Sequence, residues 1–228
     1  MLKVNNIFYS IQGEGIHSGI PTIFIRFAGC PFRCPYCDEP SALTEHNSKE
    51  YEPKELGKEI LRLSEKHNCS FIEYTGGSPE AQDNNDLLVL SRYLKRLNIN
   101  LSMQMSGGLE LKKSLWYIID NHKIDYKELS CNIPFIIKPR LLTLKDEIKF
   151  VLDADFENYE WFRDRIKIFE NSSVNIIVSS KTTSRYLNDL ENTKKITERI
   201  LNDNDINKEY LYILPRLHQL YWPNVKGV

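Results

Sequence analysis

The sequence predicts an α/β fold built on a mostly parallel sheet. Strand-like and helix-like patterns alternate along most of its 228 residues. Such alternation favours parallel strands, because each helix returns the chain to the edge where the next strand starts. Apolar residues make up 41%, enough for a core, and no apolar run approaches the length of a membrane span. Since no internal repeat or low-complexity linker interrupts the pattern, we expect one domain over residues 1–228.

The first half of the chain contains three predicted strands and two predicted amphipathic helices. After a strand-like start at 7–9, short runs rich in β-branched and aromatic residues occur at 22–27 and 71–75, and a further strand is expected at 99–103. Pro53 is expected to open the first helix, and Asp86 is expected to cap the second. Leucine and isoleucine recur at helical spacing after both residues, which gives each helix one apolar face.

The second half continues the alternation. We predict a helix around 114–121, and a polar helix between the last two strands. The remaining strands are expected at 147–152, 174–178 and 210–214. Phe156, Tyr159 and Phe162 recur every three residues, so a helix is expected to follow the strand at 147–152.

Three loops with ligand-binding character follow predicted strands. They are a cysteine-rich loop after 22–27, Thr75-Gly76-Gly77 after 71–75, and Ser106-Gly107-Gly108 after 99–103. The carboxyl ends of parallel strands lie at one edge of a sheet, where ligands of such folds bind. The sequence therefore predicts that these loops form a single active site.

Charge and cysteine content narrow the function classes. The net charge is −1, and lysines and acidic residues are interleaved without a basic stripe. This pattern argues against direct nucleic-acid binding and favours a small-molecule substrate. An odd number of cysteines (five) and a start without a targeting pattern indicate reduced thiols, so we expect a cytoplasmic protein that is not bound to a membrane.

The most informative motif is an array of three cysteines, Cys30, Cys34 and Cys37, spaced C-x-x-x-C-x-x-C. Each iron of a [4Fe–4S] cluster needs a ligand, so three thiolates leave one iron open to a substrate or cofactor. A structural zinc site would need a fourth ligand, and neither Cys69, Cys131 nor any histidine lies in a paired motif. A disulfide framework is disfavoured by the odd cysteine count.

Two further segments have groups suited to ligands. Gln12 and Glu14, in the sequence Q-G-E-G, offer paired donors and acceptors that suit the edge of a pterin or purine. The guanidinium of Arg26 suits a carboxylate, although a surface salt bridge is the commoner fate of an arginine. Gly76 and Gly77 allow a ligand to approach the backbone, although taken alone they also fit an ordinary turn.

The chain resembles the radical SAM (S-adenosylmethionine) superfamily and, within it, the 7-carboxy-7-deazaguanine synthase family. The matching segments are F-Y-S-I-Q-G-E-G, I-R-F-A-G-C-P-F-R-C-P-Y-C-D, T-G-G-S-P and L-P-R-L-H-Q-L-Y-W-P-N-V-K-G-V. The resemblance implies a partial (incomplete) β/α barrel, a [4Fe–4S] cluster, SAM, Mg²⁺ and a homodimer. It also implies a lyase that contracts the ring of 6-carboxy-5,6,7,8-tetrahydropterin, with loss of ammonia, and an electron donor such as a flavodoxin.

The resemblance also assigns residues by motif position. The three cysteines of the array would hold the cluster. The expected SAM contacts are Tyr36, Asp38, Gly76, Gly77, Ser78, Ser130 and Asn132. The expected substrate contacts are Ile11, Gln12, Gly13, Glu14, Arg26, Thr75, His218 and Val228. The tail, about 215–228, would close the site with its terminal carboxylate, and His218 is as well explained by a structural role.

Several positions depart from the family pattern. Glu39 stands where a Thr or Ser helps to bind Mg²⁺, so its carboxylate is the candidate magnesium ligand. Gln104, Asn132 and Arg216 replace a Glu, a Lys and a Gln, and Ser78 replaces an acid. Two alternatives therefore stay open: a glycyl-radical-enzyme activase, and a diverged pterin-binding protein without turnover.

Overall fold

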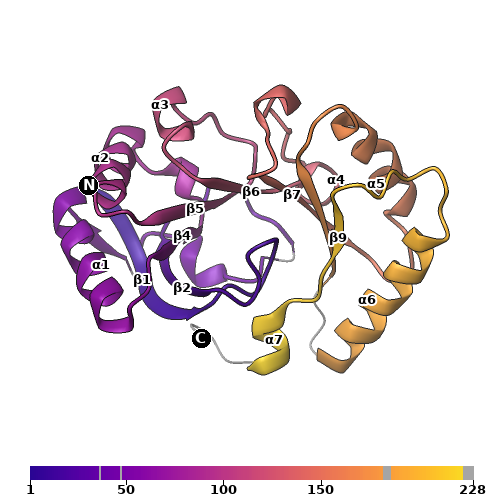
Figure 1. The fold of residues 1–228 in the computed structure, drawn as a ribbon, viewed down its shortest axis with the longest axis horizontal. Coiled ribbons are helices and arrows are strands. Elements are labelled where there is room, and N and C mark those ends of the chain that lie inside the picture. Colours follow the sequence, from indigo (N-terminus) through magenta and orange to yellow (C-terminus); the bar gives the residue numbers. More distant parts are fainter. Residues whose placement is uncertain (36, 47, 182–185, 223–228) are drawn as a thin grey trace.

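The computed structural model describes residues 1–35, 37–46, 48–181 and 186–222, without the side chains of 129, 130 and 186–188. The described residues form a nine-stranded sheet of order β3-β1-β2-β4-β5-β6-β7-β8-β9 (Figure 1). The strands are β1 (Leu2–Ile11), β2 (Pro21–Phe27), β3 (Lys49–Tyr51), β4 (Phe71–Gly76), β5 (Asn100–Met105), β6 (Asn121–Asp125), β7 (Glu147–Leu152), β8 (Asn175–Ser180) and β9 (Leu211–Ile213). The helices are α1 (Pro53–His67), α2 (Asn84–Lys95), α3 (Lys113–Trp116), α4 (Glu128–Cys131), α5 (Tyr159–Ile166), α6 (Tyr186–Leu201) and α7 (Leu217–Tyr221).

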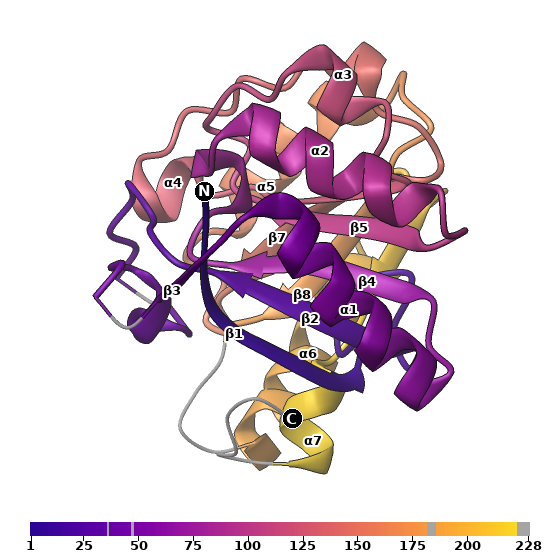
Figure 2. The same cartoon turned by 90° about the vertical axis from the view of Figure 1, so that its left-hand side faces the viewer.

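The sheet is mostly parallel and does not close. Every neighbouring pair from β2 to β9 is parallel, whereas β1 is antiparallel to both β2 and β3. Figure 1 shows the strands as an open arc with helices on its outer side. In Figure 2, α1 and α2 lie side by side on that outer side. The predicted α/β fold with an incomplete barrel is therefore confirmed.

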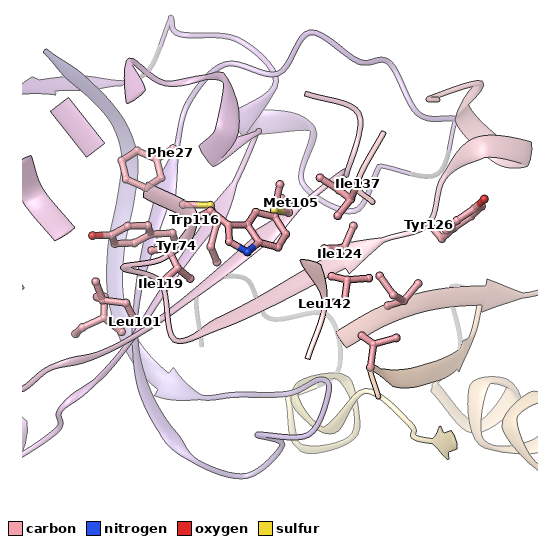
Figure 3. Packing of buried hydrophobic residues seen from close by; sticks show 14 of the residues in the cluster. Phe27, Tyr74, Leu101, Met105, Trp116, Ile119, Ile124, Tyr126, Ile137 and Leu142 are labelled. Atoms are coloured by element: carbon pink, nitrogen blue, oxygen red, sulfur yellow. The ribbon is translucent and has the colours of Figure 1, made fainter. Parts of the chain in front are cut away.

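The outer face of the sheet and the helices that cover it form the apolar core. Phe27 and Tyr74 from neighbouring strands pack edge to face, with ring centroids 5.6 Å apart. The core also contains Leu101, Trp116 and Ile119, which Figure 3 shows in the same cluster. Each fully buried side chain of this size contributes about 1.5–3 kcal/mol of burial free energy, so the covering helices stabilise the curvature of the sheet.

The inner face of the same strands is polar and buried. Side chains at alternate positions point to opposite faces of a strand, so charged residues interleaved with apolar ones line the inside. This polar inner face comprises Glu73 and Thr75 of β4, Ser102 and Gln104 of β5, Asn121, Lys123 and Asp125 of β6, and Glu147 and Lys149 of β7. Hydrogen bonds and ion pairs connect it across neighbouring strands. A polar interior open at one end is suited to a polar ligand.

Some local predictions were wrong. Asp83, not Asp86, caps α2, because its carboxylate accepts hydrogen bonds from the backbone of Asn85 and Asp86. The helix predicted at 114–121 stops at Trp116, and β6 starts at Asn121. β6 has no aliphatic run, because three of its five residues belong to the polar inner face. The structure contains no helix long and apolar enough to span a membrane among the residues that it describes.

Glu147 gives the fold a pH dependence that can be tested. Burial raises the pKa of this carboxyl to about 7, although Lys123 and the Ile16 amide favour its charged form. A raised acid pKa in the folded state means that the folded chain keeps a proton that the unfolded chain loses near pH 4.5, so stability falls as pH rises towards 7. The difference between the folded and unfolded pKa corresponds to a loss of about 3 kcal/mol in the free energy of unfolding at high pH. We expect Glu147→Gln to be stabilised relative to the parent chain by up to that amount between pH 5 and pH 8.

The measurement is the free energy of unfolding in urea at pH 5 and pH 8. Lys58→Gln, on the exposed face of α1, is the control for charge change at a solvated site. A Glu147→Gln chain whose stability follows the same pH curve as the parent would contradict the prediction.

Candidate active site

The Q-G-E-G segment lies in a loop (residues 12–20) that closes the amino-terminal end of the barrel. The His17 ring lies 4.9 Å from that of Phe71, the first residue of β4. The Ile16 amide donates to Oε2 of Glu147, the first residue of β7, over 2.9 Å. Gly15 has φ +75°, and a Cβ there would overlap the Glu147 carboxylate, so this approach requires glycine. The loop forms the floor of the interior.

The three predicted ligand-binding loops meet at the opposite, carboxyl edge. The Gly77 amide donates to the carbonyl of Phe27 over 2.9 Å. A Cβ on Gly77 would lie 2.5 Å from the Ala42 carbonyl oxygen and 2.6 Å from that of Gly29, so only a glycine fits against the cysteine loop. Ser106 contacts the same region, because its amide and hydroxyl both donate to Glu80. The prediction of one shared edge is confirmed.

The cysteine array lies half-buried on this edge. The Cys37 amide donates to the Cys34 carbonyl over 3.1 Å, which folds the array into a tight turn. Burial raises the pKa of the Cys30 thiol, and burial together with a hydrogen bond to Cys131 raises the pKa of Cys34 to about 12. Without iron the thiols of Cys30 and Cys34 are therefore protonated at neutral pH, and binding of a metal must displace their protons.

Lys127 is a site residue that the sequence analysis missed. It follows β6 directly, and its ammonium lies 3.2 Å from Oδ2 of Asp125. Burial opposes its charge, but the carboxylates of Asp125 and Asp38 and the nearby Cys34 raise its pKa. From the family pattern, Asn132 was expected to replace a lysine on the cofactor side of the site. In the structure Lys127 supplies a positive charge beside the cysteine loop.

A chain of buried charges connects the floor to this edge. The ammonium of Lys149 lies 2.6 Å from Oε2 of Glu14 and 2.9 Å from Oδ1 of Asp125. Burial alone would raise the pKa of Glu14, but Lys149 and Arg216 outweigh it and hold this pKa well below its usual range. Glu14 is therefore a carboxylate at any physiological pH, in a fixed position.

The segment after β9 also reaches the floor. The Leu217 amide donates to the Gly13 carbonyl over 2.9 Å. Nε of Arg216 lies 3.1 Å from Oε1 of Glu14, and NH1 lies 3.6 Å from Oδ2 of Asp38. A Cβ on Gly13 would overlap the ring of His218. Burial lowers the pKa of His218, so its imidazole is neutral near pH 7.

Arg26 and Glu39 form an ion pair at the entrance of the cysteine loop. NH1 of Arg26 lies 2.7 Å from Oε2 of Glu39, and the guanidinium lies 5.0 Å from the ring centroid of Phe8. Glu39 also accepts a hydrogen bond from Ser41. The carboxylate of Glu39 is thus neutralised by an arginine, and the described residues around it do not fit a magnesium site.

Three predicted site residues have buried polar atoms without a hydrogen-bond partner among the described residues. These atoms are Nε2 of Gln12, Nε of Arg26 and Oγ of Ser78. The orientation of the Gln12 amide is fixed, because its Oε1 accepts from the Glu14 amide over 3.0 Å. A buried donor without a partner costs about 1–3 kcal/mol, so these positions fit a polar ligand that supplies the missing acceptors.

The remaining predicted residues are placed as follows. Thr75 belongs to the polar inner face and donates to Gln104 over 3.1 Å. Ile11 ends β1, and Asn132 ends α4 in a left-handed conformation with φ +51°. Gly76, with φ +109°, lies against Phe27 and Arg26. Ser130 lies in α4 without a described side chain, and Tyr36 and Val228 lie outside the described residues.

Sequence reasoning missed the charged residues of the inner face, above all Asp125 and Lys149, and it also missed Lys127 beyond the end of β6. A signal was present, because H-K-I-D and E-I-K-F alternate charged with apolar residues. That alternation is usually interpreted as one solvated and one buried face. Here both faces are buried, so the charged residues had to be paired with one another, which only the curvature of the sheet reveals.

The donor set of the cysteine loop fits an iron–sulfur cluster by its chemistry. Three thiols, none in a disulfide, lie on one half-buried loop beside the cation of Lys127. Thiolates are the ligands that hold such clusters. Within the described part of the chain, no three His, Cys, Asp or Glu side chains lie close enough together to hold a single metal ion.

Known proteins share both the sequence and the fold. Residues 24–130 match the family model of the radical SAM superfamily. A 7-carboxy-7-deazaguanine synthase of Clostridium acetobutylicum is 30% identical over 236 residues, with 99% of each chain covered. That of Aquifex aeolicus is 25% identical over 225 residues, with 97% of this chain and 94% of the relative covered.

A solved structure agrees at the level of the fold. The crystal structure of QueE from Escherichia coli superposes with a TM-score of 0.59 at 19% identity, over 87% of this chain and 91% of that one. This likeness agrees with the open, mostly parallel sheet of this chain. The chain belongs to the 7-carboxy-7-deazaguanine synthase family of radical SAM enzymes.

Proposed function

We propose that this protein converts 6-carboxy-5,6,7,8-tetrahydropterin to 7-carboxy-7-deazaguanine, with loss of ammonia, on the route to queuosine precursors. The observation that carries this proposal is the match over nearly the full length of both chains to an enzyme of that name. The geometry supports it, because the polar inner face of the sheet lies between a fixed carboxylate at the floor and three thiols at the rim. An iron–sulfur cluster and SAM, when bound, supply the radical that starts the reaction.

The floor residues are suited to the pterin ring. Glu14 is held ionised by Lys149 and Arg216, so it accepts hydrogen bonds from ring N–H groups. The unpartnered Nε2 of Gln12 donates to a ring carbonyl or nitrogen. Because these two residues present an acceptor and a donor in fixed positions, they would orient the ring and reject isomers that reverse the pattern.

Arg26 is the proposed partner of the substrate carboxylate. Its Nε lacks a partner among the described residues, and its NH1 is held by Glu39. Binding a substrate anion would therefore compete with Glu39 for the same cation. His218, neutral and close to Gly13, is proposed to contact the substrate from the opposite side.

The SAM side is proposed to comprise the loops of the carboxyl edge. Gly76, Gly77 and Ser78 offer backbone groups and a buried hydroxyl next to the cysteine loop. Lys127 supplies a positive charge that stabilises thiolates and carboxylates bound there. Tyr36, Asp38, Ser130 and Asn132 stay as proposed contacts by motif position.

The tail, the partners and the metal are proposed from the resemblance. The contact of Leu217 with Gly13 supports a tail (215–228) that closes the substrate side, with the carboxylate of Val228 outside the described residues. We further propose a cytoplasmic homodimer of one-domain chains, reduced by a flavodoxin-like donor. Mg²⁺ is expected in the reaction, although Glu39 is not assigned as its ligand and no step is derived through it.

An anaerobic assay tests the proposed reaction. The reconstituted protein is incubated with SAM, Mg²⁺, reductant and 6-carboxytetrahydropterin, and the products are identified by mass spectrometry. We expect 7-carboxy-7-deazaguanine. If SAM yields 5′-deoxyadenosine while the pterin stays intact, a different substrate is indicated, such as the backbone of a glycyl-radical enzyme. Binding of the pterin without cleavage of SAM would support the non-catalytic alternative.

Gly77→Ala should disrupt the rim. The added methyl group would meet two carbonyl oxygens of the cysteine loop and its flank, at 2.5 and 2.6 Å, so the loop must shift. We expect iron incorporation to fall about tenfold, in the range seen when groups that orient metal ligands are lost. Iron and sulfide analysis of the purified protein measures this. Lys54→Ala, at an exposed position of α1 far from the rim, is the control for a substitution to alanine.

Glu39→Gln distinguishes two roles for Glu39: competition with the substrate carboxylate for Arg26, and binding of Mg²⁺. If Glu39 competes with the substrate carboxylate for Arg26, the variant frees the arginine, and KM for the pterin falls about fivefold, from about 1 kcal/mol of pairing. Arg26→Lys should raise KM instead, because an ammonium cannot form the two parallel bonds of a guanidinium.

Steady-state rates over a range of Mg²⁺ and substrate concentrations measure both effects. A higher Mg²⁺ requirement in Glu39→Gln, with an unchanged or higher KM, would mean that Glu39 is a metal ligand. A substrate analogue without the carboxylate should show no difference between Glu39→Gln and the parent enzyme.

A further inference from the structure

A fourth cysteine lies at the rim. Cys131 is the last residue of α4, which begins just after β6 at the carboxyl edge. Its amide donates to the Lys127 carbonyl over 3.0 Å. At the start of this helical turn, Glu128 accepts from Arg165 over 2.8 Å and from Tyr126 over 3.2 Å. The position of Cys131 is thus fixed by bonds at both ends of α4.

The side chain of Cys131 meets the cysteine array. It lies close enough to the thiol of Cys34 to raise the pKa of that thiol. Packing gives independent support, because Ile133, two residues further on, and Phe32 of the cysteine loop both lie against Gly108. A Cβ on Gly108 would be 3.2 Å from the Phe32 ring and would overlap Ile133. The end of α4 and the cysteine loop are therefore packed together.

Three cysteines leave the fourth iron of a cluster without a protein ligand, and a fourth thiol would suit that iron. The array offers three thiolates for four irons, and iron–sulfur clusters select soft sulfur ligands. Apart from Cys30, the described neighbours of Cys34 include the cation of Lys127, which also lies near the hard oxygens of Asp38. Cys69 is remote, because its thiol donates to the carbonyl of Pro21 at the opposite, amino-terminal end of β2.

We propose that Cys131 ligates the fourth iron of the cluster while SAM is absent, and that SAM must displace it. This inference rests on the proposed cluster but not on the identity of the substrate. The exchange changes no oxidation state: the bond between iron and the Cys131 sulfur breaks as the amino and carboxylate groups of SAM bind, and the released thiolate takes a proton from solvent. Cys131 would then protect an otherwise open iron.

Displacement has a measurable effect on affinity. If the thiolate occupies the iron in about nine molecules out of ten, the apparent Kd of SAM is about tenfold weaker than the intrinsic value. Removing the thiol should therefore tighten SAM binding by about tenfold. The same removal should expose the fourth iron to oxidative loss, which leaves a three-iron cluster with its own electron paramagnetic resonance signal.

The test compares the reconstituted parent enzyme with Cys131→Ser, Cys131→Ala and Cys69→Ala, which controls for the thiol count. SAM is titrated into each reduced protein and followed by electron paramagnetic resonance. Each oxidised, SAM-free protein is then treated with ferricyanide, and the three-iron signal is counted per cluster. We expect tighter SAM binding, an altered SAM-free spectrum and a larger three-iron yield in both Cys131 variants only.

Equal spectra, equal SAM affinities and equal three-iron yields in all four proteins would overturn the inference. In that case the proposed function stands, provided that the parent enzyme still cleaves SAM and forms product. If no cluster assembles in the parent enzyme, the proposed function and the ligand role of Cys131 both fall.

Discussion

The ammonium of Lys149, buried between the carboxylates of Glu14 and Asp125, is the interaction on which the site depends. Isolated charges in a protein interior are costly, and removing one partner of a buried pair typically costs about 3–5 kcal/mol. Lys149 therefore ties the floor loop to the curved sheet. It also keeps Glu14 ionised. Glu14 is therefore both the fixed carboxylate of the floor and the residue proposed to bind the substrate ring.

Close backbone contacts at glycines are the second constraint. Gly15 lets the floor loop reach Glu147, and Gly77 lets the loop after β4 lie against the cysteine loop. Neither approach leaves room for a methyl group. Charge pairing and glycine packing thus position opposite ends of the barrel, and the polar interior between them is left with buried donors on Gln12, Arg26 and Ser78 that a ligand can satisfy.

Two of the positions expected to depart from the family pattern, Glu39 and Arg216, form ion pairs in the structure. Glu39 neutralises Arg26, and Arg216 pairs with both Glu14 and Asp38. In each pair a positive and a negative side chain neutralise one another, so the charge of the interior stays balanced although different residues provide it. Cys131, the proposed fourth ligand, likewise lies beside Cys34.

The sequence alone determined the fold class, the cysteine array and the glycine loops at one edge, because these depend on local spacing and on the direction of consecutive elements. It also indicated Gln12, Glu14 and Arg26 through the resemblance. The tertiary structure decided what neither spacing nor resemblance could give. β6 was missed because its residues Lys123 and Asp125 are stable in a buried strand only when β4 and β7 supply opposite charges. For the same reason Lys127, Lys149 and Cys131 became site residues only once distant segments were folded together.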